Sequence, residues 1–182
     1  MDREEYLNAV TIGEREPHNA QVELVDYDEE WPALYRHEEE KIRAALGERA
    51  LSVEHVGSTS VPGLPAKPVL DINLEVADTT DEDAYVPPLE AAGYVLRIRE
   101  PDWFEHRLLK GVDPSVNLHV FPAGCAELER MLGFRDRLRA NEAERELYLR
   151  TKRELAAQTW EHVQHYADAK SEVVEEIMRR AT

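Results

Sequence analysis

The stretch Pro68–Val76, which reads PVLDINLEV, decides how the middle of this chain folds. Apolar and polar side chains alternate strictly along it, as they do on a strand that has one face on a core. The apolar set is Leu70, Ile72, Leu74 and Val76, and the polar set is Asp71, Asn73 and Glu75. The alternation predicts a strand with three oxygen-bearing side chains on the face turned away from the core.

A glycine-serine turn precedes this strand. Leu51–Val56 also alternates as a strand does, and it leads into Gly57-Ser58 and a turn-rich stretch of small residues. Glycine lets a backbone approach a ligand closely, and a serine with free backbone N–H groups can hold phosphate oxygens. Carboxylates on the neighbouring strand can hold Mg²⁺, which bridges phosphate oxygens and offsets their charge. We therefore expect a phosphate site that contains Gly57, Ser58 and Asp71.

The rest of the chain predicts further strands in the middle and helices at the end. One helix is expected from about Asp28 to Gly47 with Pro32 in its first turn, and another over 79–92, interrupted near Pro87-Pro88. The other expected strands cover 94–99, 103–109 and 116–121, and the other expected helices cover 126–140, 142–159 and 162–180. Strands grouped in the middle with helices at the end favour an α+β fold over a repeating βαβ fold.

The length of 182 residues suits one domain with a real core. Residues 1–20 are polar and show no clean hydrophobic period, so they are expected to form an N-terminal arm. Residues 21–182 are expected to form the single domain, with a sheet core at about 21–122 and a helical part at about 123–182.

Composition and charge exclude several classes of protein. The apolar content of 42% and the charged content of 33% are typical of a globular chain. Its apolar runs are far shorter than the roughly 20 residues of a membrane helix, and the N-terminus lacks a secretory pattern, so a cytoplasmic protein without a membrane partner is expected. The net charge of −16 repels phosphate backbones, so duplex nucleic acid is not expected as a partner. The single Cys125 excludes an intramolecular disulfide.

Several motifs resemble the GrpB (UPF0157) family, a branch of the nucleotidyltransferase superfamily. That superfamily carries Gly-Gly or Gly-Ser, a gap, and then Asp-apolar-Asp/Glu-apolar; here Gly57-Ser58 is followed by DINL at 71–74. The stretch HVGSTSVPGLPAKPVLDI at 55–72 resembles the GrpB signature. Other similar stretches are NLHVF at 117–121, FRDRLRAN at 134–141, KRELA at 152–156 and YADAK at 166–170. The resemblance spans roughly 21–180 and implies a nucleotidyltransferase-like mixed β-sheet packed on helices, with a C-terminal helical segment.

The sequence departs from the superfamily pattern at its metal ligands. The resemblance places the second metal carboxylate at position 73, where this chain has Asn73, which can coordinate Mg²⁺ without bringing charge. Glu75 lies about 6–7 Å further along the same strand face and can compensate only in part. The strand that corresponds to the usual third carboxylate offers Asn117 and His119. His119 could act as a base, bind a softer metal with Asp71, or hydrogen-bond a phosphate.

Two basic residues are further candidates for phosphate binding. Lys67 stands at the entrance of the Asp71 strand and could contact a phosphate. Arg107 is expected to share a strand face with Trp103 and Glu105, where it could bind an anion or form a surface ion pair. His55, just before Gly57, more often fixes a loop in such a position.

Three functions are compatible with these residues. The first is Mg²⁺-dependent transfer of a nucleotidyl or phosphoryl group from a nucleoside triphosphate to a small-molecule acceptor. Gly57, Ser58 and Lys67 would hold the phosphates, Asp71 the metal, and His119 would be a base or an extra ligand. The second is a catalytically reduced module that binds a nucleotide or another phosphorylated metabolite. The third is a helix-mediated interaction protein, whose last third could form a bundle or the face of a homodimer.

Overall fold

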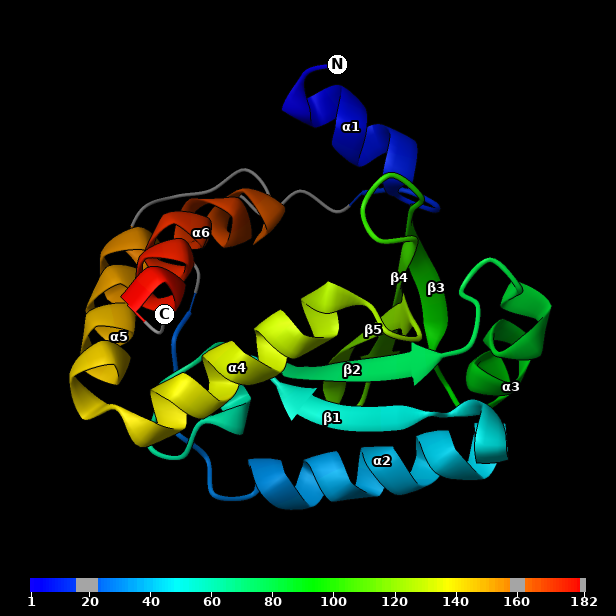
Figure 1. Ribbon diagram of the computed structural model, residues 1–182, viewed down its shortest axis with the longest axis horizontal. Helices are drawn as coiled ribbons and strands as arrows, with labels where there is room; N and C mark the ends of the chain where they lie inside the picture. Colours follow the sequence, from blue (N-terminus) through cyan, green and yellow to red (C-terminus); the bar gives the residue numbers. More distant parts are fainter. Residues whose placement is uncertain (16–22, 158–162, 181–182) are drawn as a thin grey trace.

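The middle of the chain forms one five-stranded sheet, and the computed structural model describes residues 1–15, 23–157 and 163–180 (Figure 1). The strands are β1 (Ser52–Val56), β2 (Leu70–Val76), β3 (Val95–Glu100), β4 (His106–Val112) and β5 (Ser115–Pro122). Their order is β1-β2-β5-β4-β3, with β2 and β5 parallel and the other neighbours antiparallel. The predicted α+β class with a mixed sheet is therefore confirmed.

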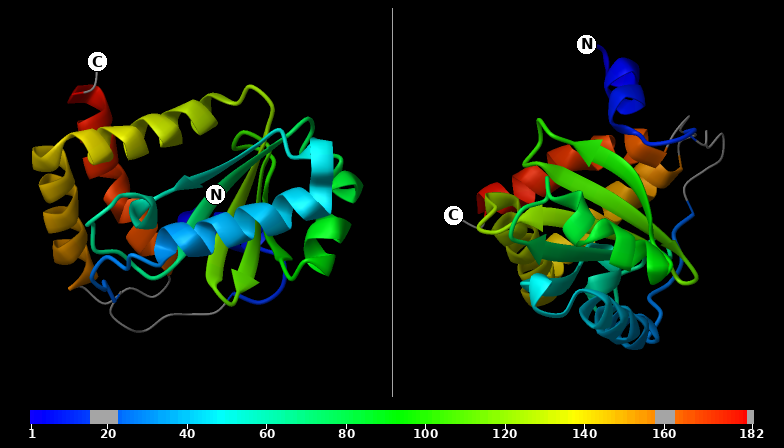
Figure 2. Two further views of the ribbon diagram at one scale, coloured as in Figure 1. Left: turned by 90° about the horizontal axis from the view of Figure 1, so that it is seen from below. Right: turned by 90° about the vertical axis from the view of Figure 1, so that its right-hand side faces the viewer.

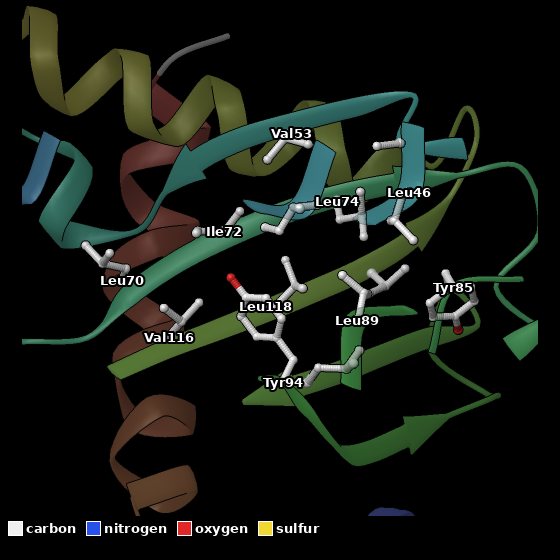
Figure 3. Packing of buried hydrophobic residues seen from close by; sticks show 14 of the residues in the cluster. Leu46, Val53, Leu70, Ile72, Leu74, Tyr85, Leu89, Tyr94, Val116 and Leu118 are labelled. Carbon is white, nitrogen blue, oxygen red and sulfur yellow. The ribbon is translucent and has the colours of Figure 1, made fainter. Parts of the chain in front are cut away.

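The predicted alternation along β2 and β5 is also confirmed. One face of these strands packs on helices α2 (Trp31–Leu46) and α3 (Val86–Ala91). Figure 3 shows the side chains of this face gathered in the main core, together with Leu89 and Tyr94. The members from the two strands are Leu70, Ile72, Leu74, Val76, Val116, Leu118 and Val120. The polar side chains of both strands consequently lie on the opposite face.

The C-terminal helical segment is present as expected. It consists of α4 (Ala126–Ala140), α5 (Glu142–Ala156) and α6 (Val163–Arg180). Helix α4 runs along the sheet beside β1 and β2, and it leads to α5 and α6 at one end of the sheet (Figures 1 and 2). Asn141 ends α4 and caps α5, because its side chain accepts a hydrogen bond from the backbone N–H of Glu144. Apolar residues of the three helices enclose Val61 and Leu64 from the loop after β1. The helical segment is thus joined to the loop that begins at Gly57.

The expected N-terminal arm differs from the structure, where residues Arg3–Val10 form helix α1. A capping box between Asp2 and Glu5 closes its first turn, and Leu7 and Val10 are buried. Thr11 then bridges to Ile98 of β3. Eight residues make only about two turns, which are too few to show a clear hydrophobic period in the sequence. So short a helix depends on its caps and on contacts with the sheet for its stability.

Other helix and strand boundaries differ from the predicted ones at positions where turn residues override the hydrophobic pattern. Pro87 and Pro88 occupy the first turn of α3 instead of interrupting a longer helix, and a short 3₁₀ helix at Glu82–Ala84 precedes it. Strand β4 begins at His106, because the turn before it has positive φ at Phe104 (+53°) and Glu105 (+50°). Two more 3₁₀ turns cover Gly47–Arg49 and Ser58–Ser60. The predicted break near residue 159 lies outside the described residues.

No helix in the described ranges is long and apolar enough to cross a membrane.

Candidate phosphate-binding site

Asp71 lies at the centre of the polar sheet face. Its strand pairs with β5 so that Asp71 stands beside Asn117, and its Oδ1 accepts a hydrogen bond from Asn117 Nδ2 at 3.3 Å. The Nε2 atom of His119 is also 3.3 Å from that oxygen. Burial alone would raise the pKa of Asp71, but His119, Lys170 and Asn117 outweigh it and hold the pKa below its usual value. Asp71 is therefore an ionised carboxylate surrounded by donors and positive charge.

The turn at Gly57 is fitted to this carboxylate. Gly57 has a φ of +71°, which favours glycine, and a Cβ added to it would lie 2.6 Å from Asp71 Oδ2. His55 holds the same loop from the core side, where its Nε2 lies 2.9 Å from Thr59 Oγ1 and its ring stacks on Tyr35. The predicted proximity of the Gly57-Ser58 turn to Asp71 is thus present in the structure.

A buried lysine from the helical segment closes the site. Lys152 of α5 is 2% exposed, and its Nζ donates to Ser58 Oγ at 2.8 Å and to the carbonyl oxygen of Pro65 at 3.1 Å. Burial, with the nearby charges of Lys170 and Lys67, lowers the pKa of Lys152 to about 7 despite the attraction of Asp71. Burial and the same type of repulsion lower the pKa of Lys67 to about 8.

This concentration of lysines is unusual for the chain. It has only five lysines, at positions 41, 67, 110, 152 and 170. Lys67 is repelled by both Lys170 and Lys110, and Lys152 by both Lys170 and Lys67, so four of the five form one electrostatic group. Lys110 pairs across the sheet with Asn117, next to Asp71. Lys41 is elsewhere and pairs with Glu38. A chain of net charge −16 therefore places most of its lysines around one carboxylate.

The sequence-predicted metal ligands are only partly brought together. Asn73 is 1% exposed and its Nδ2 donates to Met131 Sδ of α4 at 3.4 Å. Glu75 accepts from Ser52 Oγ at 3.0 Å, and it lines with Ser52 and Asn73 a separate cavity of about 260 Å³ beside α4. In the part of the chain that the structure describes, no group of three or more His, Cys, Asp or Glu could hold a metal ion.

The donor set nevertheless fits a cation that arrives with phosphate. Asn73 Oδ1 is a buried oxygen without a hydrogen-bond partner among the described residues, and Asp71 supplies one carboxylate on the same strand face. Mg²⁺ is commonly held by one or two carboxylates, and substrate phosphates and waters complete its shell. Asp71 and Asn73 therefore suit Mg²⁺ bound to a phosphate, whereas Glu75 is engaged with Ser52.

The structure does not place Arg107 with the other candidates. Arg107 is the cross-strand partner of Val120, so its side chain is on the core face, opposite to Asp71. Its Nε donates to Glu82 Oε1 at 2.8 Å, and its Nη1 donates to the carbonyl oxygen of Glu105 at 3.1 Å. The expected face shared with Trp103 and Glu105 is wrong, because these two residues lie in the turn before β4.

A line of hydrogen bonds connects His119 to the N-terminal helix. His119 Nδ1 lies 3.1 Å from Nε2 of His106, whose Nδ1 lies 2.7 Å from Oε2 of Glu100. The hydroxyl of Tyr6 in α1 donates to Oε1 of Glu100 at 2.7 Å.

Sequence patterns did not single out the distant members of this site. Lys152 and Lys170 lie on helices, where a polar residue ordinarily indicates a solvated face. Two signals were present all the same: the scarcity of lysine, and the position of both residues inside the stretches KRELA and YADAK that resemble the family.

Comparison with known proteins identifies the family. The profile of the family described as "GrpB protein" matches residues 21–180. This chain belongs to the GrpB family. A UPF0157 protein of Halalkalibacterium halodurans is 60% identical over 98% of this chain and 91% of its own length. A UPF0157 protein of Streptomyces coelicolor is 46% identical over 91% of this chain and 87% of its own length.

GrpB relatives also include longer proteins and a solved structure. A dephospho-CoA kinase of Mycobacterium tuberculosis is 32% identical over 79% of this chain, and the match covers 42% of that protein. The crystal structure of the conserved protein GrpB from Enterococcus faecalis superposes with a TM-score of 0.74 at 27% identity, covering 87% of this chain and 99% of that chain. These matches support the GrpB fold over nearly all of the described sheet and helices.

Proposed function

We propose that this GrpB protein binds the phosphates of a nucleoside triphosphate beside Asp71 and transfers a nucleotidyl or phosphoryl group to a small-molecule acceptor with Mg²⁺. The observation that carries the proposal is the convergence of Lys67, Lys152 and Lys170 on Asp71 next to Ser58. A polyphosphate relieves the mutual repulsion of these lysines and offers them charged acceptor oxygens. Its binding is therefore favoured most where the lysines are least solvated.

Each residue of the site has a role in this proposal. Lys152 and Lys67 bind phosphate oxygens, and the Gly57-Ser58 turn leaves room for the phosphate to approach the backbone. Asp71, with the amide oxygen of Asn73, would hold Mg²⁺, which neutralises phosphate charge when it is bound. His119 accepts the proton of the acceptor hydroxyl. The support for transfer, beyond binding, is the resemblance of Gly57-Ser58 and Asp71 to the nucleotidyltransferase pattern.

A second candidate is a binding module that performs no transfer. The observation that favours it is that the second and third carboxylates of the superfamily's metal site are not found beside Asp71. Position 73 is an asparagine that donates to Met131, and Glu75 is engaged with Ser52. Phosphate binding at the lysines would remain, so the module would sense a nucleotide or another phosphorylated metabolite. Dephospho-CoA belongs among the compounds to screen, since mycobacterial relatives carry the name dephospho-CoA kinase.

A purely helix-mediated role has less support. The apolar faces of α4, α5 and α6 pack on one another and on Val61 and Leu64 inside this chain. A homodimer remains a prediction, which light scattering can test.

Calorimetry combined with a turnover assay tests the proposal. Mg²⁺-ATP and Mg²⁺-GTP should bind the wild-type protein and release labelled product in the presence of candidate acceptors. Asp71→Asn should abolish turnover and the Mg²⁺ dependence of binding, and Asn73→Asp should strengthen Mg²⁺ binding because it adds a charged ligand. Binding without turnover would favour the sensing module. The absence of nucleotide binding would contradict the transferase, and the absence of binding by any of the screened phosphorylated compounds, dephospho-CoA included, would contradict the sensing module as well.

A further inference from the structure

We propose that Trp103, in the turn between β3 and β4, stacks on the nucleobase of the nucleoside triphosphate whose phosphates bind beside Asp71. This assignment depends on the proposed function, because it concerns the part of the same ligand that the lysine cluster does not hold. Trp103 is suited to the role by its exposed ring, its place on the sheet and the charge of its turn.

Trp103 combines an exposed ring with a fixed position. It is 37% exposed, and the adjacent Phe104 is 45% exposed. The Trp103 ring packs edge-on with the rings of Phe104, Phe121 and His106, at centroid distances of 5.5, 5.6 and 4.9 Å. Its backbone N–H donates to the carbonyl oxygen of Glu100 at 3.2 Å, and its carbonyl oxygen accepts from the N–H of His106 at 3.0 Å. A large aromatic surface is therefore open to solvent in a defined orientation.

Trp103 lies over the same face of the sheet as Asp71. It contacts Phe121, which shares a face of β5 with His119 and Asn117, because every second side chain of a strand points the same way. Asn117 is the cross-strand neighbour of Asp71. Phe121 stands four positions after Asn117, which is about 13 Å along β5 (Figure 1). An extended nucleoside triphosphate has a comparable length, so one molecule can reach both ends.

The face between the two ends carries further rings. His119, beside Asp71, stacks on His106 with the ring centroids 5.3 Å apart and the planes 27° apart. Trp103 is the next ring after His106. The side chain of His119 is 20% exposed, compared with 4% for His106. A ligand that extends from Asp71 to Trp103 therefore passes over His119.

The charges at the two ends determine which way round the ligand lies. The turn EPDWFE at 100–105 contains three acidic residues and no basic residue. The cations beside it, Arg107 and Arg3, interact with Glu105 and with the Tyr6 ring. Phosphate is repelled by the acidic turn and attracted by the lysine cluster, whereas a neutral nucleobase is not repelled by either. The base is consequently the end of the ligand that suits Trp103.

The backbone of the turn is strained in a way that keeps these aromatic residues. Phe104 has a φ of +53° and Glu105 a φ of +50°, a region that is unfavourable for a bulky side chain. Glycine or asparagine would connect β3 and β4 at less cost. Thr79 Oγ1 holds the strained turn by donating to the carbonyl oxygen of Glu105 at 2.6 Å. Such strain is typical of residues that contact ligands, and it supports a binding role for the exposed pair.

Calorimetry with Mg²⁺-ATP and with tripolyphosphate tests the proposal on the wild type, Trp103→Leu and Trp103→Phe. Leucine keeps an apolar side chain over Phe121 but removes the ring, and phenylalanine keeps a smaller ring. Because a base gains affinity by stacking on an aromatic side chain, Trp103→Leu should weaken ATP binding roughly five- to hundredfold, and Trp103→Phe less. Tripolyphosphate should bind all three proteins equally.

Two further measurements control this comparison. Val112→Ala changes an apolar residue that is 85% exposed at the other end of β4, and it should bind ATP as the wild type does. In proton NMR of the wild type with Mg²⁺-ATP, we expect a nuclear Overhauser effect between the adenine protons and the Trp103 indole ring. If Trp103→Leu does not fold, this spectrum still decides, because the absence of the effect would overturn the proposal.

The outcomes separate the base platform from the phosphate site. Unchanged ATP affinity in Trp103→Leu, with tripolyphosphate bound as in the wild type, would overturn the platform and leave the phosphate site supported. Equal losses of affinity for both ligands would reduce Trp103 to a packing residue. Loss of self-association in Trp103→Leu by light scattering, with ATP affinity unchanged, would assign this surface to a second copy of the chain. A wild-type protein that binds neither ligand would overturn the proposed function itself.

Discussion

The two faces of strands β2 and β5 arise from the same alternating pattern, but the side chains on each face are contacted by different kinds of partner. On the core face, Ile72, Leu74, Leu118 and Val120 are each 0% exposed and meet other apolar residues. On the polar face, Asp71 is surrounded by groups from α5, α6 and the Gly57 turn. A local pattern is sufficient to build a core face, whereas a site face depends on charges that come from distant segments.

The largest expected effect belongs to the core face. Ile72→Ala removes a fully buried side chain and should lower the free energy of unfolding by about 2–5 kcal/mol. Urea denaturation measures this loss. Asp71→Asn, one residue away on the other face, should change stability much less while it abolishes Mg²⁺-dependent binding. Equal losses of stability in the two variants would remove the distinction between the faces.

Arg107 tests the assignment of a charged residue to the core face. Arg107→Met breaks the hydrogen bond to Glu82 and should cost about 1.5–3 kcal/mol of stability. Because Arg107 lies opposite to Asp71, affinity for tripolyphosphate should not change. Calorimetry on the folded variant checks this. A tenfold weaker affinity would indicate that Arg107 takes part in phosphate binding.

Gly57 tests how closely the turn is fitted to Asp71. Alanine at a positive φ costs about 1–2 kcal/mol, so both Gly57→Ala and Gly63→Ala should lose stability. Gly63, in the same loop with φ +79°, has no heavy atom within 4 Å of an added Cβ. Only Gly57→Ala should therefore displace Asp71 and weaken phosphate binding. Identical affinities for tripolyphosphate in the two variants would argue against this fit.

These contrasts show which parts of the molecule a sequence pattern can predict. The period of two along 70–76 and 116–121 predicted the strands, their faces and Asp71, because alternation is a local property of a pleated strand. Lys152 and Lys170 could not be placed in this way, since their role depends on how α5 and α6 pack against the Gly57 loop. The predicted strand face for Arg107 was wrong, because the positive φ of Phe104 and Glu105 places these residues in a turn and β4 begins only at His106.

The pH dependence of the lysine cluster gives a smaller effect with a definite sign. Folding lowers the pKa of Lys152 from 10.5 to about 7 and that of Lys67 from 10.5 to about 8. Between these values the unfolded chain binds more protons, so these lysines make the free energy of unfolding rise as pH increases from about 7 to 10.5. Phosphate affinity should change in the opposite direction, because it requires charged lysines, and should fall as pH rises through 7 to 8.

A comparison with Lys152→Met isolates this contribution. Calorimetric titrations of tripolyphosphate at pH 6.5 and pH 9 should show a smaller decrease of affinity in the variant than in the wild type. Thermal unfolding at the same pH values should show that the variant has lost part of the rise in stability. Parallel pH profiles in the two proteins would contradict the assignment of Lys152 as a titrating phosphate ligand.

The most direct test of the lysine site is the affinity of tripolyphosphate at pH 7 for Lys152→Met and Lys41→Met. Lys41 is a control because it pairs with Glu38 and lies over the Tyr94 ring, away from the cluster. We expect an affinity at least about tenfold weaker for Lys152→Met, which corresponds to the loss of one charge-assisted hydrogen bond, and a wild-type affinity for Lys41→Met. Equal affinities in both variants, with both proteins folded, would contradict the assignment of phosphate binding to the lysine cluster.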